Sequence, residues 1–449
     1  MLIGWVWGIG LWWGADSLVV SVSQALQRAI EQAPDLQAAA TDIEAAAVDR
    51  ERARALRWIP EINLRGFLTL TPAAQGDYRD PDLGWDWSRP GPFTQWVVEG
   101  VQPIYLWNRT KILQEAASAL QEAAEQNWLR QREEVAWRVA QLYYGTLYVQ
   151  ALDELRQEAE GLLRRALRLL DSLLAEGAEG VRQADLYKAR LFEEQLRLQA
   201  LELERQHRVL QEGWRLQLGL SSSVQIRPLD SALQRIPLPI RPLEEYQALA
   251  LAYRPELFGL RAAMEAAEAT YRVTRLDRLP QVLLGVRAEL SLAPHVSRFR
   301  NPFVYDPMNA RYIGAGIVIR QNLNFRLTAL ALDRARLRRE QVRAQYEALK
   351  RAVEAEVAQA WSEFRAKDSA SVALERALRV ANEWLRTEEI NFDLDLGSAK
   401  DLVEAVQARL ELRRNLYTVL YERYLAWLRL QRASGRLYEA LMHQKRGES

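Results

Sequence analysis

The chain has 449 residues and carries 60 basic and 59 acidic side chains, a balance that excludes a general nucleic-acid-binding surface. It contains no cysteine and three histidines, His207, His295 and His443, which lie far apart in the sequence. Thiol chemistry, disulfides and zinc sites of ordinary spacing are therefore excluded. The sequence also lacks a nucleophile–base pair and a phosphate loop, so we expect no enzyme activity and no cofactor.

The longest apolar run lies at the N-terminus, in residues 2–14. It is too short for a membrane-spanning helix, which needs about 20 residues, but it matches the apolar core of a secretory signal. Two features do not fit a signal of this kind. No basic residue precedes the run, and the most suitable cleavage point, after Ala15, places Trp13 at the −3 position. We interpret residues 1–20 as an export signal whose true start could lie upstream. The alternative is an apolar segment of a protein that is not exported.

The rest of the chain contains the same pattern twice. APDL at 33–36 returns as RPEL at 254–257, and VAQLYYGTLY at 139–148 returns as VAQAWSEFRA at 357–366. The matches keep their order and an offset near half of the chain, far beyond the period of a solenoid, roughly 20–50 residues. The sequence therefore predicts a tandem duplication, with a first repeat at 21–220, an equatorial linker at 221–240 and a second repeat at 241–449.

Proline marks where long helices can form, because its ring breaks helix interiors. All 16 prolines lie in residues 34–103 and 228–307, and the proline-free tracts are rich in good helix formers. Each tract is interrupted once, at 175–181 and at 391–399, by a segment that contains glycine. In the last helix the apolar stripe has one charged gap, Arg423. We predict two helical hairpins, 110–176 with 181–219 and 326–391 with 398–435, each preceded by one opening helix, at 21–57 and at 241–278.

Between each opening helix and its hairpin, apolar and polar residues alternate with a period of two, which is typical of strands with one apolar face. The predicted strands span 61–70, 95–105, 281–292 and 311–320. The alternate positions, such as Thr69 and Ser291, are expected to tolerate arginine. The set expected to face lipid is Leu64, Leu68, Leu284, Val286, Leu290 and Ile317. The aromatic residues expected at strand ends, as in a membrane-interface girdle, are Trp58, Trp96, Tyr105, Trp107 and Tyr312.

Strands of this kind suit either a sheet packed on a soluble core or an outer-membrane barrel. The neighbouring helices are amphipathic and charged, and no separate core-forming segment exists to cover the strand faces, which favours the membrane. Four strands cannot close a barrel, because known barrels have at least eight. Several copies of the chain would therefore be required.

An ordered set of motifs, present in both halves, resembles the outer-membrane efflux protein (TolC) family over residues 21–435. The set comprises the opening VSVSQALQRAIEQAPDLQAA, the Gln102–Pro103 step, the two VAQ segments, and a glycine followed by Asp-Leu-x-x-Ala at 185–189 and 401–405. The resemblance implies a mainly α fold in which duplicated long helical hairpins form an α-barrel. It also implies that four β-strands per protomer contribute to a trimeric, 12-stranded membrane β-barrel.

The function that this resemblance implies is an outer-membrane channel with a large periplasmic part, the passive exit duct of a tripartite efflux or type I secretion system. The expected partners are a homotrimer's other copies, a periplasmic adaptor (membrane fusion) protein, an inner-membrane RND pump or ABC exporter, and outer-membrane lipid. No nucleic acid is expected. The alternative is a periplasmic coiled-coil adaptor or scaffold, which would explain the hairpins but not the duplicated strand pairs.

The resemblance also places functional residues at the hairpin ends. Asp401 and Glu404 fall where the family has acidic residues that project into the pore and narrow it, and Asp185 is the equivalent in the first repeat. The alternative is that all three are solvated acids at helix starts, where the helix dipole favours them. The residues expected at the tips, in contact with the adaptor, are Gly177, Gly180, Val181, Gly397 and Ser398.

Overall fold

The computed structural model describes residues 17–55, 60–74, 84–175, 183–221, 224–238, 240–299, 301, 303–394 and 399–443. The chain divides into two compact units. The helical unit comprises Met1–Ala40, Gln126–Phe258 and Glu347–Ser449, and the sheet unit comprises Thr41–Glu125 and Gly259–Tyr346. Each unit therefore draws residues from both halves of the chain.

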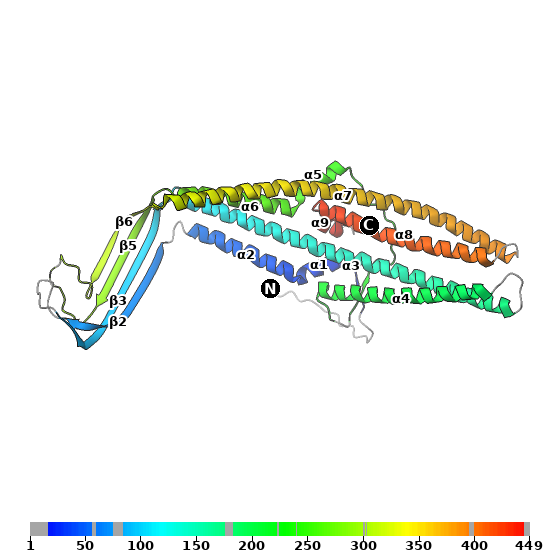
Figure 1. Cartoon of the computed structure of the whole chain (residues 1–449), viewed down its shortest axis with the longest axis horizontal. Helices are drawn as coiled ribbons and strands as arrows, with labels where there is room; N and C mark the ends of the chain where they lie inside the picture. The colour runs from blue at the N-terminus through cyan, green and yellow to red at the C-terminus, as the bar shows by residue number, and fades with distance from the viewer. Residues whose placement is uncertain are drawn as a thin grey trace, which may run out of the picture. The chain divides into compact units, whose positions relative to one another are not determined.

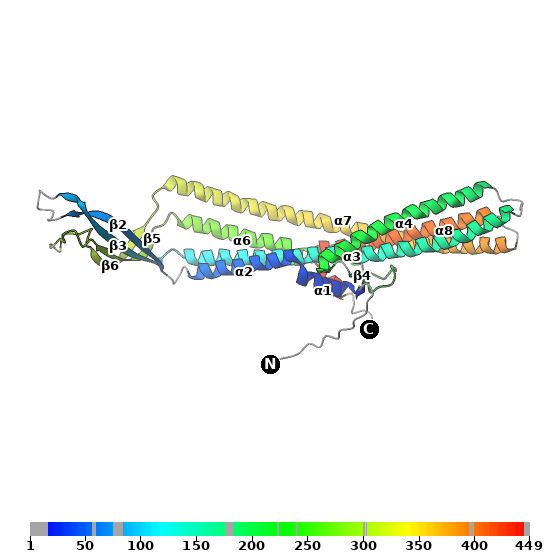
Figure 2. The ribbon, with the colours of Figure 1, turned by 90° about the horizontal axis from the view of Figure 1, so that it is seen from below.

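Helices and strands follow the same order in the two halves (Figure 1 and Figure 2). The first half contains α1 (Val22–Gln32), α2 (Pro34–Ala55), β2 (Glu61–Ala74), β3 (Trp85–Tyr105), α3 (Arg109–Ala175) and α4 (Gln183–Leu218). The second contains α5 (Leu243–Tyr253), α6 (Pro255–Leu276), β5 (Gln281–Leu292), β6 (Arg311–Arg320), α7 (Phe325–Asp393) and α8 (Ala399–Ala433). Two short strands, β1 (Ser17–Val20) and β4 (Gln225–Pro228), and the helix α9 (Leu437–His443) complete the described elements. Among the described helices, none combines the length and the apolar composition needed to cross a membrane.

Each opening segment is broken at a proline, so the prediction of one continuous helix in each half is wrong. The residues between the two helices, Ala33 and Arg254, have extended backbone with ψ of 113° and 117°. The ring of a following proline disfavours the helical conformation of the residue before it. The helix resumes at once at Pro34 and Pro255, because proline is well suited to the first position of a helix.

The two return helices, α4 and α8, both end at a glycine with left-handed backbone. Gly219 has a φ of 62° and Gly435 a φ of 73°, a conformation that side chains with a Cβ rarely adopt. A Cβ on Gly435 would also lie 2.8 Å from the carbonyl of Tyr253. The two glycines that close the repeats in the sequence are thus helix-ending residues.

The sheet unit contains one antiparallel sheet with the strand order β2-β3-β5-β6. β2 follows α2, β3 leads into α3, β5 follows α6 and β6 leads into α7 (Figure 1). Because the strands alternate in direction, all four helices join the same end of the sheet, the helix end. The connections between β2 and β3 and between β5 and β6 lie at the opposite end, the loop end.

β3 begins ten residues earlier than the predicted start at residue 95, at Trp85. Pro90 and Pro92 argue against a strand there, because proline cannot donate a ladder hydrogen bond. The early part of β3 pairs only with β2, and its pairing with β5 starts at Thr94. The missing N–H groups therefore fall in a part of β3 that has a single described neighbour.

The linker that joins the two halves is held to the helical unit by side chains. Gln211 of α4 donates to the carbonyl of Ile226 at 2.9 Å and accepts from its N–H at 3.0 Å, and β4 pairs in parallel with β1. Tyr143 of α3 donates to Asp230 at 2.6 Å. Tyr424 of α8 donates to the carbonyl of Gln234 at 2.7 Å. Strands of four residues are too short for a recognisable period, so the sequence did not predict β1 or β4.

Candidate functional site: the sheet faces and the hairpin ends

One face of the four-stranded sheet is apolar and exposed. The register pairs Leu284 with Ile317, and Trp96 with both Leu290 and Gly66, which places the even-numbered positions of β2, β3 and β5 on one face. The six residues expected to face lipid all lie on this face, so the predicted alternation is confirmed, and their contact with lipid stays a prediction. Its exposed apolar residues are Ile62, Leu64, Leu68, Leu70, Trp96, Val98, Leu284, Val286, Leu290, Ile313, Ile317 and Ile319. No described segment of the chain covers them, and contiguous apolar surfaces of this kind mark interaction sites or membrane contact.

The opposite face carries the polar residues and a connected network. Glu289 accepts from Gln95 at 2.8 Å and from Arg287 at 3.0 Å, and Arg287 also donates to Glu99 at 3.2 Å. Glu289 is nevertheless buried, and Ser291 is 0% exposed. The expectation that Ser291 tolerates arginine is therefore wrong for this position, because alternation reports the face of the sheet and not what lies over it.

Aromatic side chains mark both ends of the sheet, although not all of those predicted. At the helix end Tyr105 and Trp107 make an edge-to-face contact with centroids 4.9 Å apart, and Trp107 donates to the carbonyl of Pro280 at 2.8 Å. Tyr312 lies at the loop end of β6. The exposed Trp85, the first residue of β3, lies at the loop end of that strand. Trp58 lies outside the described residues.

Trp96 was predicted to lie at a strand end, and this prediction is wrong. β3 begins at Trp85, ten residues before the predicted start, so Trp96 lies within the strand. Its ring lies over the cross-strand partner Gly66, where an added Cβ would come within 2.6 Å of the ring. Glycine in a strand leaves a gap that an aromatic neighbour can fill. Trp96 therefore supports the sheet between its ends.

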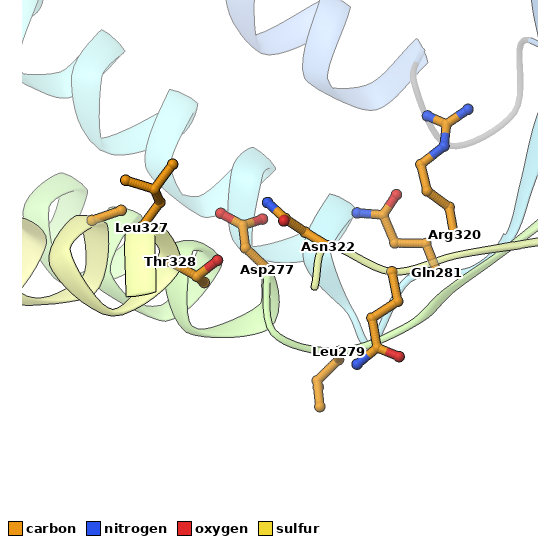
Figure 3. Close-up of a pocket in the computed structure, with 9 residues that line it drawn as sticks. Asp277, Leu279, Gln281, Arg320, Asn322, Leu327 and Thr328 are labelled. Carbon is orange, nitrogen blue, oxygen red and sulfur yellow. The ribbon is translucent and has the colours of Figure 1, made fainter. Parts of the chain in front are cut away.

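An open pocket lies where the helix end of the sheet meets α6 and α7 (Figure 3). Asp277, Gln281, Arg320, Asn322 and Thr328 are among its lining residues. Asp277 is already ion-paired with Arg109, and a neighbouring lining residue, Gln321, donates to a backbone carbonyl. Because these polar groups already bind other parts of the chain, we describe the pocket as a structural junction between the sheet and the adjoining helices.

The predicted hairpin-end acids lie at the start of the return helices. Asp401 is in the first turn of α8, Glu404 follows three residues later on the same side of the helix, and both are exposed. Asp185 lies in the first turn of α4. Sequence reasoning missed Lys400, whose Nζ lies 3.8 Å from Glu404 Oε1, although the spacing of four residues was a visible signal. The tip residues Gly177, Gly180, Val181, Gly397 and Ser398 lie outside the described residues.

Further along the hairpins, one carboxylate connects the two halves of the chain. Glu158 of α3 accepts from Arg409 at 2.8 Å and also from Arg413, both of α8. Arg409 donates to Asn382 of α7 at 3.0 Å as well. A buried apolar cluster lies in the same part of the helical unit and comprises Leu155, Ala159 and Leu163 of α3, Leu196 of α4 and Leu410 of α8. These polar partners are about 250 residues apart in sequence, and no local pattern signals them.

A family model described as outer membrane efflux protein matches residues 25–211 and 247–436. The chain belongs to the outer membrane efflux protein family. The two matched stretches correspond to the two halves that share one element order, and the linker lies between them. As an outer membrane efflux protein, the chain is located in the bacterial outer membrane, with a large periplasmic helical part, and acts as an efflux channel. Proteins of this family are transport proteins without enzymatic activity.

Solved structures of outer-membrane channels and of a further outer-membrane protein share the fold of this outer membrane efflux protein. The outer-membrane channel OprN is 18% identical with a TM-score of 0.74, covering 93% of this chain and 90% of its own. CusC is 19% identical with a TM-score of 0.72, covering 95% of both chains. The outer membrane protein VceC from Vibrio cholerae is 18% identical with a TM-score of 0.73, covering 93% of this chain and 96% of its own. No curated protein matches the sequence significantly.

Proposed function

We propose that the protein is the passive exit duct of a tripartite efflux or type I secretion system, formed by three copies of the chain. The observation that carries this function is the exposed apolar face of the sheet, backed by a polar face on the same strands. An alternation of this kind lets one face contact lipid while the other encloses water. In a periplasmic adaptor or scaffold the same face would lie in water, where it would promote aggregation.

The open edges of the sheet support assembly with further copies. Within the described residues, β6 pairs on one side only, and so does β2 apart from an isolated bridge at Ala74. Unpaired edges of this length invite pairing with another chain, and closure of a barrel removes them. Pairing β6 of one copy with β2 of the next gives eight strands from two copies and twelve from three, both permitted for barrels. The resemblance to the family selects the trimer.

A stripe on α4 supports the same assembly in the helical unit. Its members are each more than half exposed and lie on one side of the helix at spacings of 4, 7, 3, 8 and 7 residues: Tyr187, Leu191, Leu198, Leu201, Val209 and Leu216. The other side of α4 is already buried within the chain through Leu196 and Trp214. A helix with two apolar sides needs a second partner, and a further copy of the chain is the occupant that the trimer provides.

Light scattering on detergent-extracted protein tests the trimer. The parent protein should have the mass of three chains, and a folded monomer in water without detergent would contradict the assignment. Leu198→Asp should weaken the trimer, because it places a charge in the apolar stripe. Gln199→Asp, one residue away on an exposed side of α4, is the matched control and should leave the mass unchanged.

At the hairpin ends, Asp401 and Glu404 line the narrow periplasmic end of the channel, with Asp185 as their first-repeat equivalent. Their exposure at the start of α8 supports this role, since a threefold axis there would turn each acid into a ring. The tips between the paired helices are the part that contacts the periplasmic adaptor. Cross-linking from α8 residues near Asp401 to a co-expressed adaptor tests this contact, and capture at distant α7 positions alone would contradict it.

Export of the chain belongs to the same proposal. β1 begins at Ser17 and pairs along Ser17–Val20 with β4, so cleavage after Val20 would remove a strand of the folded protein. Cleavage after Ala15 retains it. Mass spectrometry of the N-terminal peptide from outer-membrane preparations should therefore find a mature protein that begins at Asp16.

A further inference from the structure

The connection between β5 and β6, residues 293–310, has a defined conformation in its described part, and we call this connection the strap. Asp306 accepts from the backbone N–H groups of Phe299, Met308 and Asn309 at 3.0–3.1 Å. The Asn309 amide accepts from the N–H of Ala293 at 3.2 Å, which closes the base of the connection. These bonds satisfy backbone groups at both ends of the strap and hold the described residues there in place.

The strap does not stay above its own two strands. His295 Nε2 lies 2.9 Å from both the hydroxyl and the carbonyl oxygen of Thr71, and the Ser297 N–H donates to the carbonyl of Ala74 at 3.1 Å. Val296 forms a β-bridge with Ala74. Thr71 and Ala74 belong to β2, which is separated from β5 by β3. The strap therefore crosses β3 to reach β2.

It crosses on the polar face. Thr71 continues the odd-numbered positions of β2 that include Asn63, and its register partner on β3 is Gly91. A Cβ on Gly91 would lie 2.4 Å from the His295 ring, so the crossing requires glycine at this point. Further along, the Tyr305 hydroxyl donates to Glu289 at 2.7 Å, which is a second anchor on the same face.

Burial in this part of the sheet agrees with that position. On the polar face Phe93 and Val97 of β3 are 8% and 6% exposed, and Glu289 and Ser291 of β5 are also buried. On the apolar face of the neighbouring strand, Leu68 is 75% exposed. The polar face of β3 and β5 is thus covered towards the loop end, whereas on β2 the polar-face Phe67 is 55% exposed. The large residues of the apolar face stay exposed.

We propose that the strap narrows the outer mouth of the channel and limits the size of the solutes that can pass it. This role rests on the proposed function: if the apolar face contacts lipid, the polar face encloses the lumen, and the strap lies inside it. The loop end is the end opposite to the periplasmic helices, so three straps would stand at the external opening. His295 and Tyr305 hold each strap against the wall.

A single reporter cysteine tests this barrier, and the parent chain contains no cysteine that could interfere. Asn63 lies on the polar face at the helix end of β2 and is exposed, so a reagent from outside must pass the strap to reach Asn63→Cys. Intact cells are treated with a small charged maleimide and with a graded series of polyethylene-glycol maleimides. The matched control is Leu64→Cys, the adjacent residue on the apolar face, which neither reagent should label.

We expect the small reagent to label Asn63→Cys and the larger polymers to fail. Gly91→Val, which displaces the His295 ring, should raise the polymer size that reaches the cysteine, and so should His295→Ala combined with Tyr305→Phe. Ser297→Ala keeps the backbone bond to Ala74 and should leave the size limit at the parent value.

Two results would overturn the role of the strap. One is labelling of the parent reporter by the largest polymers. The other is an unchanged size limit in both release variants while the small reagent still labels, since such labelling shows that the wall has formed. Absence of labelling by the small reagent, or labelling of Leu64→Cys in its place, would instead contradict the channel and its register.

Discussion

The guanidinium of Arg423 on α8 donates through Nε to the carboxylate of Asp368 on α7 at 2.6 Å, where only 1% of the arginine side chain is exposed. Its Nη2 donates to the carbonyl of Ile236 in the linker at 3.1 Å, and Asp368 also pairs with Arg235 of the linker. The charged gap in the apolar stripe of the last helix is therefore, together with the neighbouring Tyr424, a point where the linker is attached to the second hairpin. A buried cation needs such partners, because an unpaired one is strongly unfavourable.

Removing the acid should destabilise the protein. Asp368→Ala leaves Arg423 buried without its ion partner, and we expect a loss of roughly 3 kcal/mol, at the low end for buried pairs because Asp368 is partly exposed. Arg423→Met combined with Asp368→Ala should recover most of the lost stability, because the buried cation is then absent. The measurement is thermal unfolding of the detergent-solubilised protein. Glu363→Gln breaks the more exposed pair with Arg429 and is the control, with an expected change below about 1 kcal/mol.

The same pair predicts an acid limit of stability. Burial raises the pKa of Asp368, but the bonds to Arg423 and Arg235 lower it more, so the pKa lies below its usual value. The pair's contribution is therefore complete above the unfolded-state pKa, about 4, and is lost as the pH falls through the folded-state pKa. Asp368→Asn should flatten the fall in unfolding temperature below that pH. A parallel fall in variant and parent would contradict the assignment.

Glu133 predicts the opposite dependence. Burial raises the pKa of this carboxyl, against the lowering by the N–H groups of Tyr438 and Leu437 at the start of α9 and by Arg132. The folded state therefore favours the protonated acid, and this stabilisation is present at low pH and is lost as the pH rises through the folded-state pKa. Glu133→Gln should raise the unfolding temperature at neutral pH and lose that advantage below about pH 4. Glu134→Gln, which removes the ion pair with Arg432, should not raise it.

The two faces of the sheet should differ sharply in their tolerance of charge. Leu64→Arg should cost roughly 2–4 kcal/mol if the position lies near the middle of the bilayer. Asn63→Arg, on the exposed polar face one residue away, should cost much less. Unfolding in denaturant from lipid vesicles measures the difference. Equal costs for the two variants would reject the membrane-facing register.

The hairpin-end acids should control ion selectivity. Asp401→Ala combined with Glu404→Ala should lower cation selectivity and weaken block by multivalent cations in planar bilayers, because like charges gathered on an axis attract cations. Lys400→Ala should do the reverse, since its ammonium lies 3.8 Å from Glu404 and offsets that charge. If conductance, selectivity and block in the double variant match the parent, the acids are solvated surface residues.

The sequence by itself determined the elements and their faces. Proline distribution predicted the hairpins to within a few residues, and alternation predicted four strands and the apolar side of three of them, although β3 begins ten residues earlier than predicted. These features could be read because both signals are local: a helix or strand repeats its environment every few residues. Two of the failures were local too, at Pro34 and Pro255, where a single ring interrupts an otherwise regular pattern.

Only the tertiary structure decided which polar residues meet. Arg423 is hydrogen-bonded to Asp368, which is 55 residues away in the sequence. The corresponding separations are 224 residues for His295 and Thr71 and 251 residues for Glu158 and Arg409. Ser291 reads as a tolerant polar position from alternation, yet it is completely buried. The period of a sequence pattern indicates the side of the helix or strand to which each side chain points. The group that the side chain contacts depends on how distant segments pack, and that packing leaves no local pattern in the sequence.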